Sequence, residues 1–274
     1  MEGLIVGKES LAPGVYLLTV KAEEIVKKAR AGQFVILRVD ERGERFPLTL
    51  SDFDTEAGVI RVVFQEVGTS TSRLARLGQG DTIRNVIGPL GSPTEISRFG
   101  RVVCVGGGIG VACLCPVIRA FKGARNEVTS IIGAKSKEFL IFKDRIREVS
   151  DGFLAATDDG SYGARGLVTD VLRGLLESGA KVDRVFAVGP AVMMKAVAEA
   201  TRPYSIKTIA SLNSLMLDGT GMCGACRVIV NGERKLTCID GPEFDAHRVD
   251  FDLLLSRLDT YRDEEEASYR LLKQ

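Results

Sequence analysis

The stretch Val102-Val-Cys-Val-Gly-Gly-Gly-Ile-Gly-Val-Ala112 joins an apolar run to a turn made almost entirely of glycine. Residues 101–105 predict a buried strand, and residues 111–121 could form a helix directly after the turn. Backbone amides at such a helix start can bind a pyrophosphate. The match to Gly-x-Gly-x-x-Gly is incomplete, since Val111 stands at its last position. A tight turn without any ligand explains these glycines about equally well.

The pattern continues after this turn as alternating strands and helices. We expect strands at 127–133, 152–156 and 182–188, and helices at 168–178 and from 190 to about 200. This alternation predicts a parallel sheet with crossover helices, which assigns residues 98–204 to a Rossmann-like α/β domain. A second turn, Gly189-Pro190, follows the last strand, at the sheet edge where ligands usually bind. A proline in the first turn of a helix also occurs without any ligand.

The chain before the glycine turn is rich in short strands. Runs of β-branched residues at 15–20, 34–39, 48–50 and 59–67 are separated by turn signals, so residues 1–97 are expected to form an antiparallel β-barrel. Arg45 could clamp a phosphate, although an arginine before a strand is usually a surface residue. Thr49, Ser70 and Thr71 could donate hydrogen bonds to the same ligand.

The chain after about residue 205 carries the sharpest motif, Asp218-x4-Cys223-x2-Cys226-x11-Cys238. Three soft thiolates and a carboxylate at this spacing favour a 2Fe–2S cluster, with aspartate at the position of the first of four cysteines. One alternative is a structural zinc site. Another is that Asp218 only stabilises the turn and binds no metal. Asn231-Gly232 predicts a hairpin within this module, and residues 251–274 are helical in character.

Composition excludes several classes of function. The chain has 274 residues with 37 basic and 36 acidic side chains, which gives no overall attraction to nucleic acid or an anionic membrane. His247 is the single histidine, so a multi-histidine metal site and a Rieske centre are excluded, and we expect a structural or interfacial role for it. Cys113 and Cys115 are expected to be packing residues. With no signal-peptide pattern or membrane-spanning run, the expected location is the cytoplasm.

Taken in order, these motifs resemble the ferredoxin–NADP⁺ reductase superfamily. The cysteine module is similar to that of the branch containing the electron-transfer subunits of dihydroorotate dehydrogenases. The chain is most similar to the small subunits of NADH-dependent reduced ferredoxin:NADP⁺ oxidoreductases, a group that includes the β subunits of archaeal sulfide dehydrogenases. In that group aspartate replaces the first cysteine. The stretches that carry the resemblance are 31–37, 41–49, 63–68, 88–91, 218–226 and 238–244.

The resemblance implies two nucleotide cofactors and a cluster, and no catalytic acid, base or nucleophile. It places FAD between the barrel and the α/β domain, NAD(H) over the flavin, and a 2Fe–2S cluster in the module 205–274, which also carries a C-terminal helical tail. The implied FAD contacts are Arg45, Pro47, Leu48, Thr49, Gln65, Ser70 and Thr71. The implied NAD(H) contacts are Gly106, Gly107, Gly108, Gly110, Gly189, Pro190 and Met193. The implied cluster ligands are Asp218, Cys223, Cys226 and Cys238.

The resemblance also implies a partner. The partner would be a larger subunit carrying a second FAD and 4Fe–4S clusters, whose flavin bifurcates electrons and through which ferredoxin is reached indirectly. Lys135 and Lys137 follow the second strand of the α/β domain and could meet a 2′-phosphate, so the choice between NAD and NADP stays open. Two other hypotheses are an electron-transfer subunit of dihydroorotate dehydrogenase and a zinc-stabilised nucleotide-binding protein without turnover.

Overall fold

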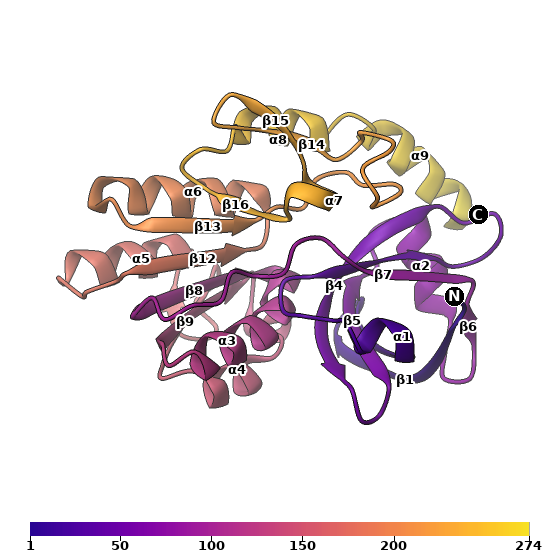
Figure 1. The fold of residues 1–274 in the computed structure, drawn as a ribbon, viewed down its shortest axis with the longest axis horizontal. Coiled ribbons are helices and arrows are strands. Elements are labelled where there is room, and N and C mark those ends of the chain that lie inside the picture. Colours follow the sequence, from indigo (N-terminus) through magenta and orange to yellow (C-terminus); the bar gives the residue numbers. More distant parts are fainter. Residues whose placement is uncertain (274) are drawn as a thin grey trace.

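The computed structural model describes residues 1–273 and has three parts. Figure 1 shows an N-terminal barrel on one side and a sheet covered by helices on the other. The C-terminal part lies across the top of both, with its last helix reaching back to the barrel. This arrangement confirms the expected fold class of a β-barrel, a parallel α/β domain and a small C-terminal module.

The barrel is a seven-stranded antiparallel sheet in the order β6-β1-β2-β5-β4-β3-β7. Its core is made of apolar side chains such as Leu18, Leu37, Leu50 and Ile60, all with no exposed surface. The elements are β1 (Gly3–Ala12), β2 (Val15–Lys21), α1 (Glu23–Val26), β3 (Phe34–Arg38), β4 (Arg45–Asp54), β5 (Val59–Gln65), α2 (Thr69–Arg76), β6 (Thr82–Ile83) and β7 (Asn85–Leu90).

The central sheet has the order β11-β10-β9-β8-β12-β13-β16, and all its pairs are parallel except the last. Successive residues of its middle strand face opposite sides: Cys104 packs toward α3 and α4, and Val103 and Val105 pack toward α5 and α6. The elements are β8 (Arg101–Gly107), α3 (Leu114–Gly123), β9 (Glu127–Ala134), α4 (Lys143–Val149), β10 (Gly152–Thr157), β11 (Ala164–Arg165), α5 (Val168–Glu177), β12 (Arg184–Val188), α6 (Ala191–Thr201) and β13 (Lys207–Ser211).

The C-terminal part begins with a glycine-rich loop and the predicted hairpin. Asn231 and Gly232 both have positive φ, at 55° and 77°, as a type I′ turn requires. The tail is helical as expected, apart from Gln274, which lies outside the described residues. The elements are β14 (Arg227–Val230), β15 (Glu233–Leu236), α7 (Thr237–Asp240), β16 (Glu243–Asp245), α8 (Phe251–Leu258) and α9 (Arg262–Lys273).

Two boundaries differ from those expected. The helix expected over 111–121 is a 3₁₀ turn at Gly108–Cys113 followed by α3, because Pro116 fits only the first turn of a helix and α3 starts two residues before it. β13 pairs in parallel with β12, so the central sheet continues past residue 204. Within residues 1–273, no helix is both long and apolar enough to cross a membrane.

The contact between α3 and the sheet gives a stability prediction. Leu114 is fully buried against one face of the sheet. We expect Leu114→Ala to lower the free energy of unfolding by about 2–5 kcal/mol, since it leaves a cavity in a packed core. Leu271 of α9 is 72% exposed, so Leu271→Ala should change it by less than about 0.5 kcal/mol. Urea denaturation measures the free energy of unfolding of both variants. An equal decrease in the two would contradict the assignment of Leu114 to the core.

Candidate functional site

A cavity of about 900 Å³ lies between the barrel and the carboxyl ends of the parallel strands. One wall comes from β4 and β5 of the barrel, and the other comes from the turns after β8, β9, β12 and β13. Most of the predicted cofactor-binding residues line it. They are Pro47, Leu48, Thr49, Gln65, Gly107, Gly108, Gly110, Gly189, Pro190 and Met193.

The two predicted glycine turns touch through their backbones. A Cβ added to Gly110 would lie 2.8 Å from the carbonyl oxygen of Val188 and 2.9 Å from the Cα of Gly189. A Cβ on Gly189 would lie 3.0 Å from the carbonyl oxygen of Gly107. Glycine is therefore required at Gly110 and Gly189 for the turns to close against each other, whether or not a ligand is bound.

Four predicted cofactor residues lie outside the cavity lining. Arg45 is exposed at the start of β4, and Gly106 sits behind the turn, where a Cβ would meet Leu114 at 2.6 Å. The other two are at the start of α2. The hydroxyl of Thr71 accepts hydrogen bonds from the amides of residues 67 and 68, and that of Ser70 donates one to Glu44 at 3.4 Å.

The lining also includes residues outside the predicted FAD and NAD(H) contacts. Lys135 and Asp158 stand at the ends of neighbouring strands β9 and β10, whereas Lys137 is absent from the lining. Residues 211–214 and Met216 run along the cavity from β13 toward the cysteine loop. The hydroxyl of Ser214 is the one buried side-chain polar atom of residues 1–273 that lacks a hydrogen-bond partner. A polar ligand in the cavity would supply that partner.

The loop 218–226 is organised around the carboxylate of Asp218. Its oxygens accept hydrogen bonds from the backbone amides of Thr220 at 2.7 Å and of Cys223 at 2.8 Å. These bonds, led by that from Thr220, hold the pKa of Asp218 below its usual value, so the group is an anion at neutral pH. Gly219, Gly221 and Gly224 have φ between 66° and 86°. The loop can therefore wind tightly around a small group.

The three cysteines of this module differ in burial. The sulfur atoms of Cys226 and Cys238 lie 3.2 Å apart in the core, while Cys223 is exposed on the loop. Burial of Cys238 and its contact with Cys226 raise its pKa to about 12. Within residues 1–273, no three Cys, His, Asp or Glu side chains stand close enough together to hold a metal ion. The structure thus brings two of the four predicted ligands together and places the other two on the adjoining loop.

One side chain of the barrel and one of the segment after β13 connect the cysteines to the cavity. Phe34 and Met216 line the cavity and also belong to the apolar cluster around Cys226 and Cys238. The loop itself lies on the barrel, because a Cβ on Gly219 would meet the side chains of Ile36 and Leu90 at 2.8 Å. A group held by the cysteines would therefore be separated from the cavity by little more than one layer of side chains.

The remaining cysteines and the histidine have structural surroundings. Burial raises the pKa of Cys113 and of Cys115 to about 11, which keeps both as neutral thiols. A ring nitrogen of His247 lies 2.9 Å from the hydroxyl of Thr201, and burial lowers its pKa. These contacts agree with the packing and structural roles expected for these residues.

A barrel and a parallel sheet enclose a cavity, and a cysteine loop lies at the cavity edge, which is an arrangement suited to a modular electron-transfer reductase. Residues 213–250 match the model of the iron-sulfur cluster binding domain of dihydroorotate dehydrogenase B. A Thermotoga maritima protein described as a dihydroorotate dehydrogenase B (NAD(+)) electron transfer subunit homolog is 47% identical over 98% of this chain and 95% of its own. The chain belongs to the family of dihydroorotate dehydrogenase B electron transfer subunits.

Two further comparisons refine this result. The electron transfer subunit of Geobacillus thermodenitrificans dihydroorotate dehydrogenase B is 32% identical over 89% of this chain and 96% of its own. A solved structure of an NADH-dependent reduced ferredoxin-NADP oxidoreductase, described in connection with flavin-based electron bifurcation, matches with a TM-score of 0.94 and 44% identity. That match covers 99% of this chain and 98% of the other. The chain is therefore an oxidoreductase electron-transfer subunit, and the expected family resemblance is confirmed.

The closed glycine turns give a binding prediction. We expect Gly110→Ala to weaken NADH binding by at least about tenfold, because the new methyl forces the two turns apart. Gly174→Ala is the matched control: a Cβ there meets nothing within 4 Å, and alanine favours helix α5. Calorimetric titration with NADH measures both variants. Unchanged affinity in Gly110→Ala would show that the turns do not form the nucleotide site.

Proposed function

We propose that this chain passes electrons between NAD(H), FAD and a 2Fe–2S cluster, and exchanges them with a larger partner subunit. One observation carries the proposal: a single cavity joins the barrel to the nucleotide turns, and the cysteine loop lies at its edge. When bound, these groups convert a two-electron hydride transfer into single-electron steps. The protein's part is to hold the groups close together and to keep water away from them.

The barrel wall is proposed to hold FAD. Pro47, Leu48 and Thr49 on β4 and Gln65 on β5 line one side of the cavity, where apolar surface and a few polar atoms suit a flavin ring. Arg45, Ser70 and Thr71 lie beyond the lining. They are proposed to meet the phosphates of the dinucleotide, because an arginine and the start of α2 are both favourable to an anion.

The opposite wall is proposed to hold NAD(H). Gly107, Gly108 and Gly110 form one turn of this wall, and Gly189 and Pro190 form the other. The side chain of Met193 lies against them, within 3 Å of the space that a Cβ on Gly107 or Gly189 would take. Gly106 contributes by packing behind the first turn.

The cysteine loop is proposed to hold the cluster through Asp218, Cys223, Cys226 and Cys238. The donor set fits iron, since thiolates are the usual ligands of iron–sulfur clusters, and the ionised Asp218 supplies the fourth. The adjoining amides of the glycine-rich loop are available to a sulfide or thiolate. We therefore propose three modules. Residues 1–97 bind FAD, and residues 98–204 together with β13 bind NAD(H). The remaining C-terminal residues hold the cluster and form the helical tail.

The partner is proposed to be a larger flavin and 4Fe–4S subunit, through which ferredoxin would be reached. The likeness to the bifurcating oxidoreductase supports this choice. The similarity to electron transfer subunits of dihydroorotate dehydrogenase B favours a dihydroorotate dehydrogenase catalytic subunit as the second candidate. Leu217, Met222 and Ile239 are exposed around the cysteine loop and would be covered by either partner. The complex is expected in the cytoplasm.

Co-purification distinguishes the two partners. We expect anaerobic purification of the tagged chain from its native host to yield a larger subunit that contains flavin and 4Fe–4S clusters, identified by mass spectrometry. A dihydroorotate dehydrogenase subunit would support the second candidate. A chain that is recovered alone would contradict both assignments.

The metal ligands can be tested separately from the flavin. We expect Cys226→Ser to lose iron and sulfide but to keep FAD, because the proposed flavin contacts lie on the barrel. Cys115→Ser is the control, since Cys115 is also buried but lies in α3. Iron, sulfide and flavin analysis of the purified variants gives the answer. Loss of flavin together with iron would contradict separate modules.

If Asp218 is a cluster ligand, its replacement by cysteine should shift the midpoint potential of the cluster in a known direction. We expect Asp218→Cys to retain a cluster with a lower midpoint potential, because a thiolate donates more charge to iron than a carboxylate does. A redox titration followed by electron paramagnetic resonance measures it. A midpoint that is unchanged or higher would exclude Asp218 as a ligand.

A further inference from the structure

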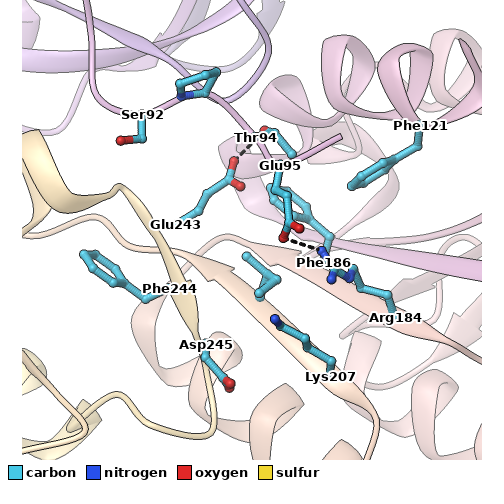
Figure 2. Close-up of a pocket in the computed structure, with 12 residues that line it drawn as sticks. Ser92, Thr94, Glu95, Phe121, Arg184, Phe186, Lys207, Glu243, Phe244 and Asp245 are labelled. Carbon is cyan, nitrogen blue, oxygen red and sulfur yellow. Dashed lines mark hydrogen bonds and ion pairs between the residues drawn. The ribbon is translucent and has the colours of Figure 1, made fainter. Parts of the chain in front are cut away.

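The segment that follows Cys238 is fixed by the linker between the barrel and the central sheet. Figure 2 shows Glu243 of β16 pointing toward Thr94 in a second pocket, of about 180 Å³, at the amino ends of β12 and β13. The hydroxyl of Thr94 donates a hydrogen bond of 2.6 Å to the Glu243 carboxyl. The amide of Ser92 donates one of 2.7 Å to the carbonyl of Gly241. The segment is therefore held by this linker, and the exposed cysteine loop needs other contacts.

An arginine of α8 holds the exposed loop that carries Cys223. Met222 and Cys223 are both exposed on this loop. A guanidinium nitrogen of Arg257 donates a hydrogen bond of 3.0 Å to the carbonyl oxygen of Ala225, which stands between Cys223 and Cys226. Within residues 1–273, no carboxylate forms an ion pair with Arg257. The bond is therefore charge-assisted, and the whole positive charge lies beside the loop.

The helix that carries Arg257 is itself firmly placed. Phe251 and Leu254 of α8 are buried in the same apolar cluster as side chains of β14. Leu254 and Arg257 lie three residues apart, which places them on one face of the helix. Lys195 of α6 forms an ion pair of 2.7 Å with Asp252, which ties α8 to the α/β domain. Arg257 therefore reaches the loop from a fixed position.

Each of the two peptide groups around Ala225 has its carbonyl oxygen bonded to an arginine. The peptide before Ala225 accepts a hydrogen bond of 3.3 Å from Arg227, and its N–H donates one of 3.5 Å to the sulfur of Cys223. The peptide after Ala225 accepts the bond from Arg257. Both peptides are trans, so each N–H points away from its arginine. A cation at the oxygen polarises the peptide, which strengthens the hydrogen bond that the N–H donates.

We propose that Arg257 is a positioning residue for the cluster: with support from Arg227, it orients the peptides between Cys223 and Cys226 and raises the midpoint potential. The inference rests on the proposed function, because it concerns the cluster that these cysteines would hold. Reduction adds one negative charge to a 2Fe–2S cluster. A nearby positive charge and stronger N–H bonds to cysteine sulfur therefore stabilise the reduced form more than the oxidised form.

A redox titration of the cluster-loaded chain, followed by electron paramagnetic resonance, tests the proposal. Arg257→Met keeps the apolar stem of the side chain but removes its charge and its donors. At the wild-type midpoint, we expect the ratio of reduced to oxidised cluster to fall roughly tenfold in this variant, which corresponds to a midpoint lower by about 59 mV. Arg257→Lys keeps the charge, so the ratio should fall less than about twofold, which corresponds to about 18 mV.

Arg262→Met is the matched control for the loss of a positive charge. Arg262 begins α9, its side chain is 69% exposed, and it pairs with Asp259 and Glu266 instead of the loop. The midpoint of this variant should equal that of the wild type. A wild-type midpoint in Arg257→Met would overturn the proposal, and so would an equal fall in Arg257→Lys or in Arg262→Met.

A second variant decides the effect on the potential if Arg257→Met does not retain iron. Arg227→Met removes the other guanidinium, which is exposed and makes the longer hydrogen bond. We expect the ratio of reduced to oxidised cluster to fall roughly threefold, which corresponds to about 28 mV. An unchanged midpoint in Arg227→Met would then overturn the proposal.

Hydrogen–deuterium exchange of peptides covering residues 219–226 tests the positioning role separately. Exchange should be roughly threefold or more faster in Arg257→Met than in the wild type and in Arg257→Lys, because the loop loses an anchor. Equal exchange in all three would overturn the positioning role. If the wild type bound no cluster, the proposed function would fail, and this comparison would still decide whether Arg257 holds the loop.

Discussion

The packing of β3 against the cysteine core is the contact on which the rest of the arrangement depends. Phe34 and Ile36 lie against Cys226 and Cys238, and Phe34 also lines the main cavity. In the barrel Phe34 is paired with Thr49 of β4, so the wall proposed for the flavin and the side chains against the cysteines belong to one antiparallel ladder. A shift of this strand by one residue would turn these side chains to the other face.

The same arrangement explains why few reactive side chains are needed. The nucleotide turns close on each other through glycine backbones, and the cysteine loop is organised by backbone amides around Asp218. In an electron-transfer subunit the protein contributes distances, orientation and exclusion of water, while the bound groups carry the redox chemistry.

Sequence patterns predicted the parts that are specified locally. The glycine turns, the Asn231-Gly232 hairpin and the cysteine spacing each depend on the backbone freedom or ligand chemistry of neighbouring residues. β13 was not predicted, because its five residues carry no strong strand pattern and are stabilised by pairing with β12. The hydroxyl of Ser214 and the contact between Thr94 and Glu243 could not be predicted either, since each depends on segments far apart in the chain.

Cofactor analysis of the chain, purified without oxygen, tests the central claim most directly. The account predicts one flavin, two irons and two sulfides for each chain, with the yellow-brown absorbance of a flavin and iron–sulfur protein. A colourless chain that contains zinc instead of iron would contradict it. Such a result would leave the fold as described but would make the cysteine loop a structural site with no part in electron transfer.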